Sequence, residues 1–412
     1  MSTQWVATSV PLEHDLDLND VARGDGFLFV RDGVGFAARG AAASCRLDDA
    51  RALLNSVAIE KNPPDNHGRP ILIGCLPFLE HDDTTFFLPQ MIVSKSADGA
   101  RSLTVLTPGA LTPTDRDVAV QHAITEITAP VQRPLPSSNS YEVSPLTPVE
   151  TYLGAVTAAR DAVRAGIITK AVIARDIQIT AREPIDIHAV LLRLKASFGS
   201  SYRYAVDGLV GASPELLLEI DNGTVRSNPL AGTTARTGDP STDSRLAAEL
   251  LASPKNQIEH RVVVDMVHDT LLPHCSYLDW EPEPSVVAVA NVQHLGTLVE
   301  GRLSNPDIHI LDLARALCPT PALGGAPRKE ALELIASTEG LQRGNYGGAV
   351  GWFDAQGNGT FAVTIRCAEF DQSRTRARLF AGGGIVADSE PLAELAETQA
   401  KFQAMLSAIV RP

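Results

Sequence analysis

Cysteine is scarce in this sequence, and its spacing excludes two common uses of the residue. The five cysteines lie far apart, and no two of them form a C-x-x-C pair. An odd number of scattered thiols makes neither a disulfide framework nor a zinc knuckle. We therefore expect buried, reduced cysteines in a cytosolic protein.

Long apolar runs and clusters of basic residues are also missing. No apolar stretch reaches the roughly 18 residues of a membrane helix. The N-terminal residues contain neither the basic nor the apolar region of a secretory signal. The formal net charge of -14 repels a phosphate backbone. We therefore expect a cytoplasmic protein that binds neither membranes nor nucleic acid, although cations gathered in one cleft could still bind a small anion.

Hydrophobic residues are plentiful, at 44% of 412 residues, which is typical of a globular enzyme and not of a disordered chain. Residues 1–127 contain short predicted strands, for example at 26–30 and 71–78, but no motif that carries chemistry. Residues 128–148 are rich in Pro and Ser, which indicates a linker or an exposed connection. Residues 149–412 hold every candidate for chemistry.

The second part mixes helices, strands and hairpin turns in no regular alternation. This mixed order favours an α+β fold with antiparallel or mixed sheets over a doubly wound parallel sheet. The clearest predicted segments are helices at 149–166, 187–199 and 391–410, a strand at 170–180 and hairpin turns at 221–223 and 357–359.

The last predicted helix, 391–410, is the most informative segment. Its charged residues are spaced by four, three and four positions, which places them on one face. A solvent-exposed face with an ion pair between neighbouring turns is the alternative. The charged residues are Glu390, Glu394, Glu397 and Lys401, and the predicted core stripe opposite them is Leu392, Leu395, Phe402, Leu406 and Ile409.

Three consecutive glycines, Gly382, Gly383 and Gly384, precede this helix and follow a strand-like run. Glycine allows positive φ and lets a ligand approach backbone N–H groups. No G-K-[ST] follows, so the segment is not a phosphate loop; a bulge or a tight turn is the alternative. Together, the glycines and the helix predict a pocket for a carboxylate beside a metal ion.

Two further charged residues suit such a pocket. Glu259 lies in a predicted helix, and Mg²⁺ prefers carboxylate ligands from two or three such residues; a solvated helix residue is the alternative. Arg366 lies in a predicted strand of mostly apolar or small residues, where it needs an acidic partner or a ligand carboxylate. For Arg366 a structural salt bridge is the alternative.

An acid and a base can also be proposed. Lys170 begins a predicted strand; buried in a cleft, it could act as a general base, and otherwise it is an edge-strand lysine. Glu215 precedes a strand rich in leucine, and an apolar pocket would raise its pKa, as a general acid requires. The sequence alone does not place the two on opposite sides of a substrate.

At these same segments the chain resembles the chorismate-binding enzyme family, which includes anthranilate synthase component I, aminodeoxychorismate synthase, salicylate synthase and isochorismate synthase. The resemblance covers roughly residues 150–412 and implies the fold of that family, with large antiparallel or mixed sheets packed together and flanked by helices. The matching stretches are KAVIAR, GASPELLL, NPLAGTTAR, LLASPKNQIEH, HLGT, PTPALGGAP, YGGAVGW, TIRCAEF, LFAGGGIV and AETQAK.

The resemblance also implies a role for each matching residue. Lys170 matches the lysine that activates water, and Glu215 matches the acid that protonates the departing C4 hydroxyl. Glu259 and Glu397 match magnesium ligands, with Glu394 close to the metal. The implied substrate-binding residues are Arg366, Lys401, Gly382, Gly383, Gly384, Tyr346, His294 and Leu323, the last three lining the ring.

A few residues favour one reaction within the family. The motif around Ala231 reads PLAGT, where aminodeoxychorismate synthases carry a nucleophilic lysine, and ammonia-using members differ at Lys170. The PTPAL stretch resembles members that form isochorismate; Cys318 before it stands where relatives often have histidine. The resemblance therefore implies Mg²⁺-dependent conversion of chorismate to isochorismate by a monomer without a glutaminase subunit. Salicylate formation, anthranilate-type amination and a non-catalytic sensor of aromatic carboxylates stay open, as does the pathway served: menaquinone, siderophore or salicylate.

Overall fold

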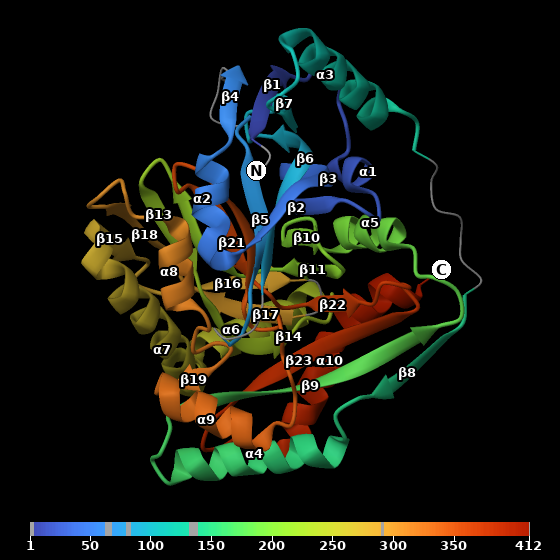
Figure 1. Ribbon diagram of the computed structural model, residues 1–412. Coiled ribbons are helices and arrows are strands. Elements are labelled where there is room, and N and C mark those ends of the chain that lie inside the picture. The colour runs from blue at the N-terminus through green and yellow to red at the C-terminus, as the bar shows by residue number, and fades with distance from the viewer. Residues whose placement is uncertain (1–3, 62–67, 80–83, 132–138, 290–291, 412) are drawn as a thin grey trace.

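The computed structural model describes residues 4–61, 68–79, 84–131, 139–289 and 292–411. Two large layers of antiparallel strands, joined where β5 pairs with β6, form its centre (Figure 1). Among the described strand pairs only β1 and β4 are parallel. In order across the first layer, the strands are β4 (Ala58–Lys61), β1 (Trp5–Pro11), β7 (Arg101–Pro108), β6 (Thr85–Lys95), β3 (Val34–Arg46), β2 (Phe27–Arg31), β10 (Tyr202–Val206), β11 (Leu209–Ser213), β22 (Cys367–Phe370), β23 (Arg376–Ile385) and β9 (Lys170–Ala181), with β8 (Tyr141–Pro145) and β19 (Gly325–Ala326) on the far side of β9.

The second layer packs its inner face against the first. Phe36 on β3 makes an edge-on ring contact with Trp352 on β20, at 5.8 Å between ring centroids. The largest apolar cluster fills this interface and continues toward α7 and α8. In order, the strands of the second layer are β5 (Ile71–Leu76), β20 (Ala349–Asp354), β21 (Gly359–Val363), β12 (Leu216–Asp221), β13 (Thr224–Asn228), β18 (Val299–Leu303) and β15 (Cys275–Trp280).

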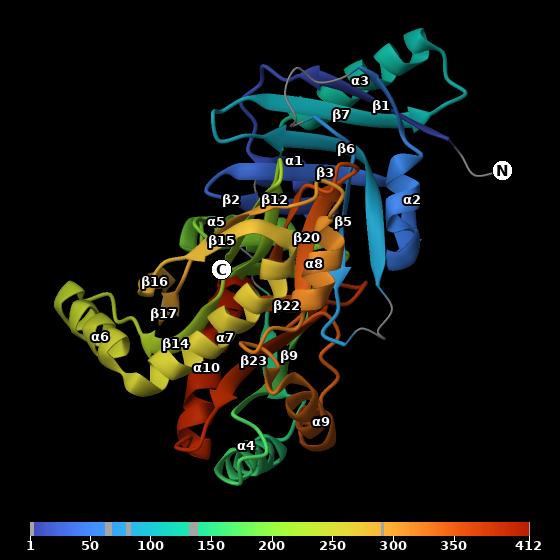
Figure 2. The same ribbon diagram turned by 90° about the vertical axis from the view of Figure 1, so that its left-hand side faces the viewer.

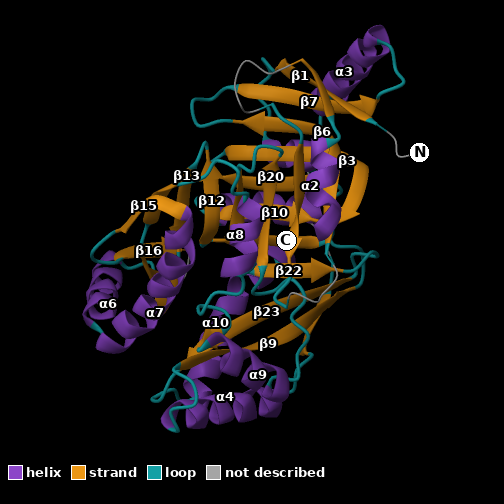
Figure 3. Cartoon of the chain, turned by 60° about the vertical axis from the view of Figure 1, so that its left-hand side comes forward, coloured by secondary structure: helices purple, strands orange, loops and turns teal. Residues whose placement is uncertain are grey.

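Helices cover the outer surfaces of the layers (Figure 3). The first layer is covered by α1, α3, α5 and α10, whose apolar faces share one cluster with its strands, and α4 and α9 pack against β9. The helices are α1 (Leu18–Ala22), α2 (Ala50–Asn55), α3 (Pro113–Thr128), α4 (Val149–Arg164), α5 (Ile187–Ser197), α6 (Pro240–Ala252), α7 (Pro254–Leu271), α8 (Ile310–Leu317), α9 (Arg328–Thr338) and α10 (Pro391–Val410), with short 3-10 turns at Leu47–Asp49 and Leu272–His274.

A small three-stranded sheet stands apart from the two layers. Its strands are β14 (Leu230–Ala235), β17 (Val292–Gly296) and β16 (Ser285–Val289). It packs against α6 and α7, at the lower left in Figure 2. This lobe faces β9, β23 and α10, so residues distant in the sequence are brought to one cleft.

The predicted α+β class is confirmed, and the N-terminal part belongs to the same sheets as the rest. β2 pairs with β10, and β5 pairs with β20, across the predicted boundary at 128–148. Within that segment, 132–138 lie outside the described residues and Tyr141–Pro145 forms β8 beside β9. The division into parts at 1–127, 128–148 and 149–412 stays a prediction.

The state of the cysteines and the length and polarity of the helices agree with what the composition predicts. All five cysteines are free: three are buried, and Cys45 and Cys275 are half-buried. Within the described residues no helix is long and apolar enough to cross a membrane.

Candidate active site

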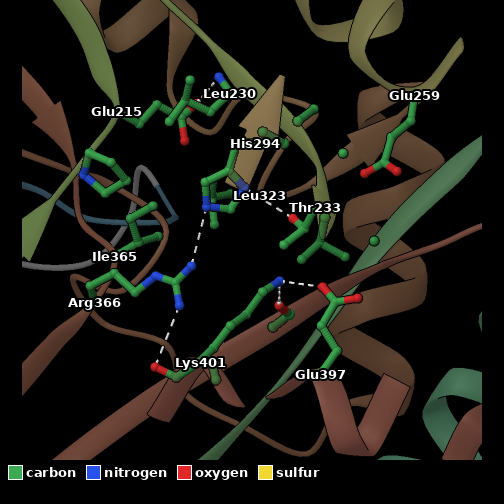
Figure 4. A pocket seen from close by; sticks show the side chains of 18 of the residues that line it. Glu215, Leu230, Thr233, Glu259, His294, Leu323, Ile365, Arg366, Glu397 and Lys401 are labelled. Carbon is green, nitrogen blue, oxygen red and sulfur yellow. Dashed lines mark hydrogen bonds and ion pairs between the residues drawn. The ribbon is translucent and has the colours of Figure 1, made fainter. Parts of the chain in front are cut away.

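One cavity of about 240 Å³ gathers the residues that the sequence predicts for the site (Figure 4). It lies between the small lobe and the strands β9 and β23, and α10 contributes one wall. Gly383 and Glu390 do not line it. The predicted residues that do are Lys170, Glu215, Glu259, His294, Leu323, Tyr346, Arg366, Gly382, Gly384, Glu394, Glu397 and Lys401.

Lys170 is a buried lysine at the start of β9. It is not an edge-strand residue, because β9 lies between β23 on one side and β8 and β19 on the other. Only 2% of Lys170 is exposed, and its Nζ donates to Glu259 Oε1 at 2.7 Å. Glu259 reaches this position from α7. The structure therefore couples the predicted base to a predicted metal ligand.

Glu215 lies in the turn between β11 and β12 and is 2% exposed. Burial raises the pKa of Glu215 to about 8, while a hydrogen bond from the Leu230 N–H at 3.3 Å and the charge of Lys170 act against the rise. The carboxyl group is thus largely protonated at neutral pH. A protonated acid and a lysine that line one cavity are the pair that the sequence predicts.

Helix α10 supplies Glu394, Glu397 and Lys401 from successive turns. Glu394 is 7% exposed and the Glu397 side chain 36%, so this face is only partly solvated. Lys401 Nζ lies 2.6 Å from Glu397 Oε1 and donates to the Gly382 carbonyl at 2.7 Å. Glu390 is the exposed N-cap and lies outside the cavity.

The two glutamates of this helix differ in their electrostatics. Burial raises the pKa of Glu394, and the neighbouring Glu397 carboxylate acts in the same direction. Burial alone would also raise the pKa of Glu397, but the charges of Lys401, Arg366 and Lys255 outweigh it and lower the value. Glu397 is therefore the more readily ionised of the pair.

The predicted core stripe of α10 is wrong at its first position. Leu392 is 72% exposed, whereas Phe402 and Ile409 are buried. Helix α10 packs against β23, α4 and α5, and Leu392 in its first turn points into solvent.

The three glycines lie inside β23 and pair with β9 without a register shift, so neither a bulge nor a tight turn forms at them. Their φ angles are not positive. In the register with β9, Gly382 faces Ala174 and Gly384 faces Val172. The N–H groups of Ala174 and Val172 bond elsewhere, to Glu339 and to the Gly324 carbonyl. The N–H and C=O groups of successive residues point to opposite sides of a strand, so those of Gly382 and Gly384 point away from β9.

Glycine is needed at these positions because carboxylate side chains approach the strand closely. A Cβ at Gly384 would lie 2.8 Å from Glu259 Oε1, and a Cβ at Gly383 would lie 2.8 Å from Glu394 Oε2. Such distances are shorter than a carbon–oxygen contact allows, so any side chain would displace these carboxylates. Gly383 thus leaves space for the Glu394 carboxylate, and its own N–H and C=O groups point toward β9.

Arg366 lies between β21 and β22, outside both strands, with a φ of 52°. It is 8% exposed, and its Nη groups lie 3.5 Å from the Lys401 carbonyl and 3.4 Å from His294 Nε2. Among the described residues no carboxylate is within ion-pair distance of this guanidinium, so the structural salt bridge is not observed. A buried guanidinium in a cavity has the chemistry to bind a ligand carboxylate.

The contacts of His294 define its tautomer. Burial, followed by the charges of Arg366 and Lys401, lowers the pKa of His294 to about 3, so the ring is neutral. A guanidinium only donates, so Nε2 accepts from Arg366. The ring proton is then on Nδ1, which lies 3.0 Å from Thr233 Oγ1. Thr233 is therefore left with a hydroxyl proton to donate.

Some lining residues were not predicted individually. Thr233, Lys255 and Asn256 line the cavity, although all three lie within stretches that carry the family resemblance. The threonine could have been found as the neighbour of the PLAG motif. Cys318 does not line the cavity; its Sγ lies 3.9 Å from the Pro77 carbonyl.

The comparison with known families agrees with this site. A sequence profile described as chorismate binding enzyme matches residues 42–410. The chain belongs to the chorismate-binding enzyme family. The profile extends the resemblance seen at 150–412 into the N-terminal part of the chain, which explains why both parts share the same sheets.

The relatives of this chorismate-binding enzyme include several isochorismate synthases. Isochorismate synthase DhbC of Bacillus subtilis is 40% identical over 284 residues, which are 66% of this chain and 71% of the relative. The vibriobactin-specific isochorismate synthase of Vibrio cholerae is 33% identical over 349 residues, 84% of this chain and 80% of the relative. The solved structure of menaquinone-specific isochorismate synthase MenF from Escherichia coli has a TM-score of 0.82 at 23% identity, covers 98% of this chain and 95% of its own, and shows the shared fold.

Proposed function

We propose that this enzyme is an isochorismate synthase that converts chorismate into isochorismate with Mg²⁺. The observation that carries the proposal is that one cavity holds a buried lysine, a protonated glutamic acid and a guanidinium that pairs with no carboxylate of the described residues. A sensor of aromatic carboxylates needs the arginine alone. The isochorismate synthases among the relatives support the same conclusion.

The reaction is an S_N2′-type exchange in which the acid and the base act on different oxygens. Lys170 accepts a proton from water as the water oxygen bonds to C2 and the double bonds shift. Glu215 donates its proton to the C4 oxygen as the C4–O bond breaks, so a water molecule leaves. Lys170 Nζ donates to Glu259 Oε1 at 2.7 Å, so the proposed base lies directly beside a proposed metal ligand.

The carboxylates of the cavity suit Mg²⁺. Glu259 and Glu397 point into the same part of the cavity from α7 and α10 (Figure 4), and Glu394 lies one turn before Glu397. Within the described residues these groups do not form a compact cluster of three. Mg²⁺ keeps several waters and takes few protein ligands, so two or three carboxylates suffice. When bound, it would neutralise the charge of the ring carboxylate.

Replacing Glu397 by glutamine is expected to raise the Mg²⁺ concentration for half-maximal activity by about tenfold or more, because a metal ligand loses its charge. Glu390→Gln removes the same charge from the same helix outside the cavity and is the matched control. The measurement is chorismate turnover against Mg²⁺ concentration. Equal shifts in the two variants would show a general charge effect and contradict the assignment.

Replacing Arg366 by glutamine is expected to raise KM for chorismate by about 10- to 100-fold, because a charge-assisted bidentate contact is lost from a desolvated site. Arg366→Lys keeps the charge without the planar fork and is expected to recover part of the loss. Steady-state kinetics separates this binding effect from a change in kcat. An unchanged KM in the glutamine variant would remove Arg366 from substrate binding.

Amination is the alternative that differs most in its product. Ala231 lines the cavity where the resemblance places the nucleophilic lysine of aminodeoxychorismate synthases. The test is turnover of chorismate in ¹⁸O-labelled water that contains ammonium, with mass spectrometry of the product. We expect one labelled oxygen and no added nitrogen; nitrogen in the product would overturn the proposal.

A further inference from the structure

A second cavity, of about 350 Å³, lies on the N-terminal side of the first layer. Its walls come from the segment before α1, the turn between β2 and β3, and the ends of β6 and α5. Figure 1 shows α1 and α5 beside β2 and β10 in this region. It shares no lining residue with the active-site cavity.

Arg203 on β10 forms the floor of this second cavity. It is 2% exposed, and burial lowers its pKa against the charges of Asp17 and Asp32. Nη1 donates to Asn19 Oδ1 at 2.9 Å. Nε has no partner, and Nη2 makes no hydrogen bond to any described residue.

The two unpartnered donors lie on one edge of the guanidinium. Nε and Nη2 are the pair that binds both oxygens of a carboxylate side-on. A buried donor without an acceptor costs free energy that a ligand would recover. Asn19 fixes the other edge, because its own amide donates to Asp17 Oδ1 at 2.6 Å. The fork is thus held in place, and its other edge has no hydrogen-bond partner among the described residues.

The charges around the cavity favour a monoanion. Three cations line it, Arg203, Lys95 and Lys195, against two carboxylates, Asp15 and Asp17. Lys195 Nζ lies 2.6 Å from Asp17 Oδ2, and Lys95 Nζ lies 3.9 Å from Asp15 Oδ1. One positive charge is therefore left over among the lining residues, on the buried arginine.

We propose that this cavity binds a small organic monocarboxylate, with the carboxylate on the Nε–Nη2 edge of Arg203. The apolar part of the ligand would contact Leu16, Leu18 and Val30, which also line the cavity. The proposal does not depend on the reaction at the first site.

The strand register places this second cavity next to catalytic segments. Arg203 pairs with Ala212 on β11, and the Ala212 N–H donates to the Arg366 carbonyl at 3.1 Å. Glu215 follows three residues after Ala212. An occupied second site would therefore lie one strand away from two residues of the active site.

The test is calorimetric titration with 4-methylpentanoate, using 4-methylpentanamide as the uncharged control. Because Arg366 could also take the probe, the titration uses the Arg366→Gln enzyme. We expect one equivalent of carboxylate bound and no amide. Adding Arg203→Gln should weaken binding about 10- to 100-fold.

A second variant protects the test against a folding defect in Arg203→Gln. Lys195 is half-exposed, so Lys195→Met should fold, and it should weaken binding severalfold because Asp17 loses its counter-charge. Lys329→Met on α9 is the matched control and should change nothing. No carboxylate binding to the Arg366→Gln enzyme, equal binding in the Lys195 and Lys329 variants, or binding of inorganic phosphate alone would each overturn the proposal.

Discussion

The Lys170→Ala enzyme is expected to turn over chorismate about 10²- to 10⁴-fold more slowly than the wild type, because the general base is removed. Binding of chorismate should be spared, since the carboxylate-binding groups Arg366 and Lys401 are untouched. The measurement combines kcat with a binding titration of chorismate at saturating Mg²⁺. Near-normal turnover would contradict the role of Lys170.

A matched variant separates the loss of a general base from the loss of a positive charge at position 170. Lys170→Arg keeps a cation that can pair with Glu259, but arginine does not lose its proton in proteins. We expect this variant to be as slow as Lys170→Ala. Substantial activity in Lys170→Arg would show that the position supplies positive charge and not a base.

The Glu215→Gln enzyme is expected to lose about 10²- to 10⁴-fold in kcat, because glutamine cannot donate a proton to the leaving oxygen. Its carbonyl can still accept the Leu230 N–H. The wild-type kcat/KM should fall as pH rises through about 8, where Glu215 loses its proton, and this alkaline limb should vanish from the residual activity of the variant. A variant that keeps both the rate and the limb would exclude Glu215 as the acid.

Measurements of the free energy of unfolding distinguish this loss of kcat from misfolding of the variant. The pKa of Glu215 in the folded state, about 8, lies above the ordinary value of 4.5 for a glutamic acid. The folded state therefore holds the proton more tightly, and the free energy of unfolding falls by up to about 1.4 kcal/mol per pH unit between these values. Glu215→Gln should remove this dependence and be no less stable than the wild type at pH 8. Glu219→Gln, at a partly exposed carboxylate of β12 that pairs with Arg226, controls for a lost carboxylate.

Helices and strands were predicted from the sequence where the local pattern of residues and the long-range packing favour the same structure. The spacing along 391–410 gives α10 its bounds and brings Glu394, Glu397 and Lys401 to one side. Lys170 was predicted at the start of a strand and Glu215 just before one. In the structure β9 begins at Lys170, and β12 begins directly after Glu215. That such residues line one cavity depends on how the small lobe folds over β9, which no local pattern contains.

The errors have physical causes of the same kind. Three consecutive glycines suggested positive φ angles, because their tolerance of positive φ is a local property, but in β23 they provide space for carboxylates from α7 and α10. Arg366 looked like a strand residue, because the apolar run continues past the end of β21. Arg203 carried no signal at all, since its burial results from α1 and α5, which are distant in sequence.

The proposed reaction is tested by incubating the purified enzyme with chorismate, with and without Mg²⁺, and resolving the products by chromatography. We expect isochorismate in a reversible mixture with chorismate, formed only when Mg²⁺ is present. Salicylate and pyruvate as products would contradict it in favour of salicylate synthase, and bound chorismate without any turnover would contradict it in favour of a sensor.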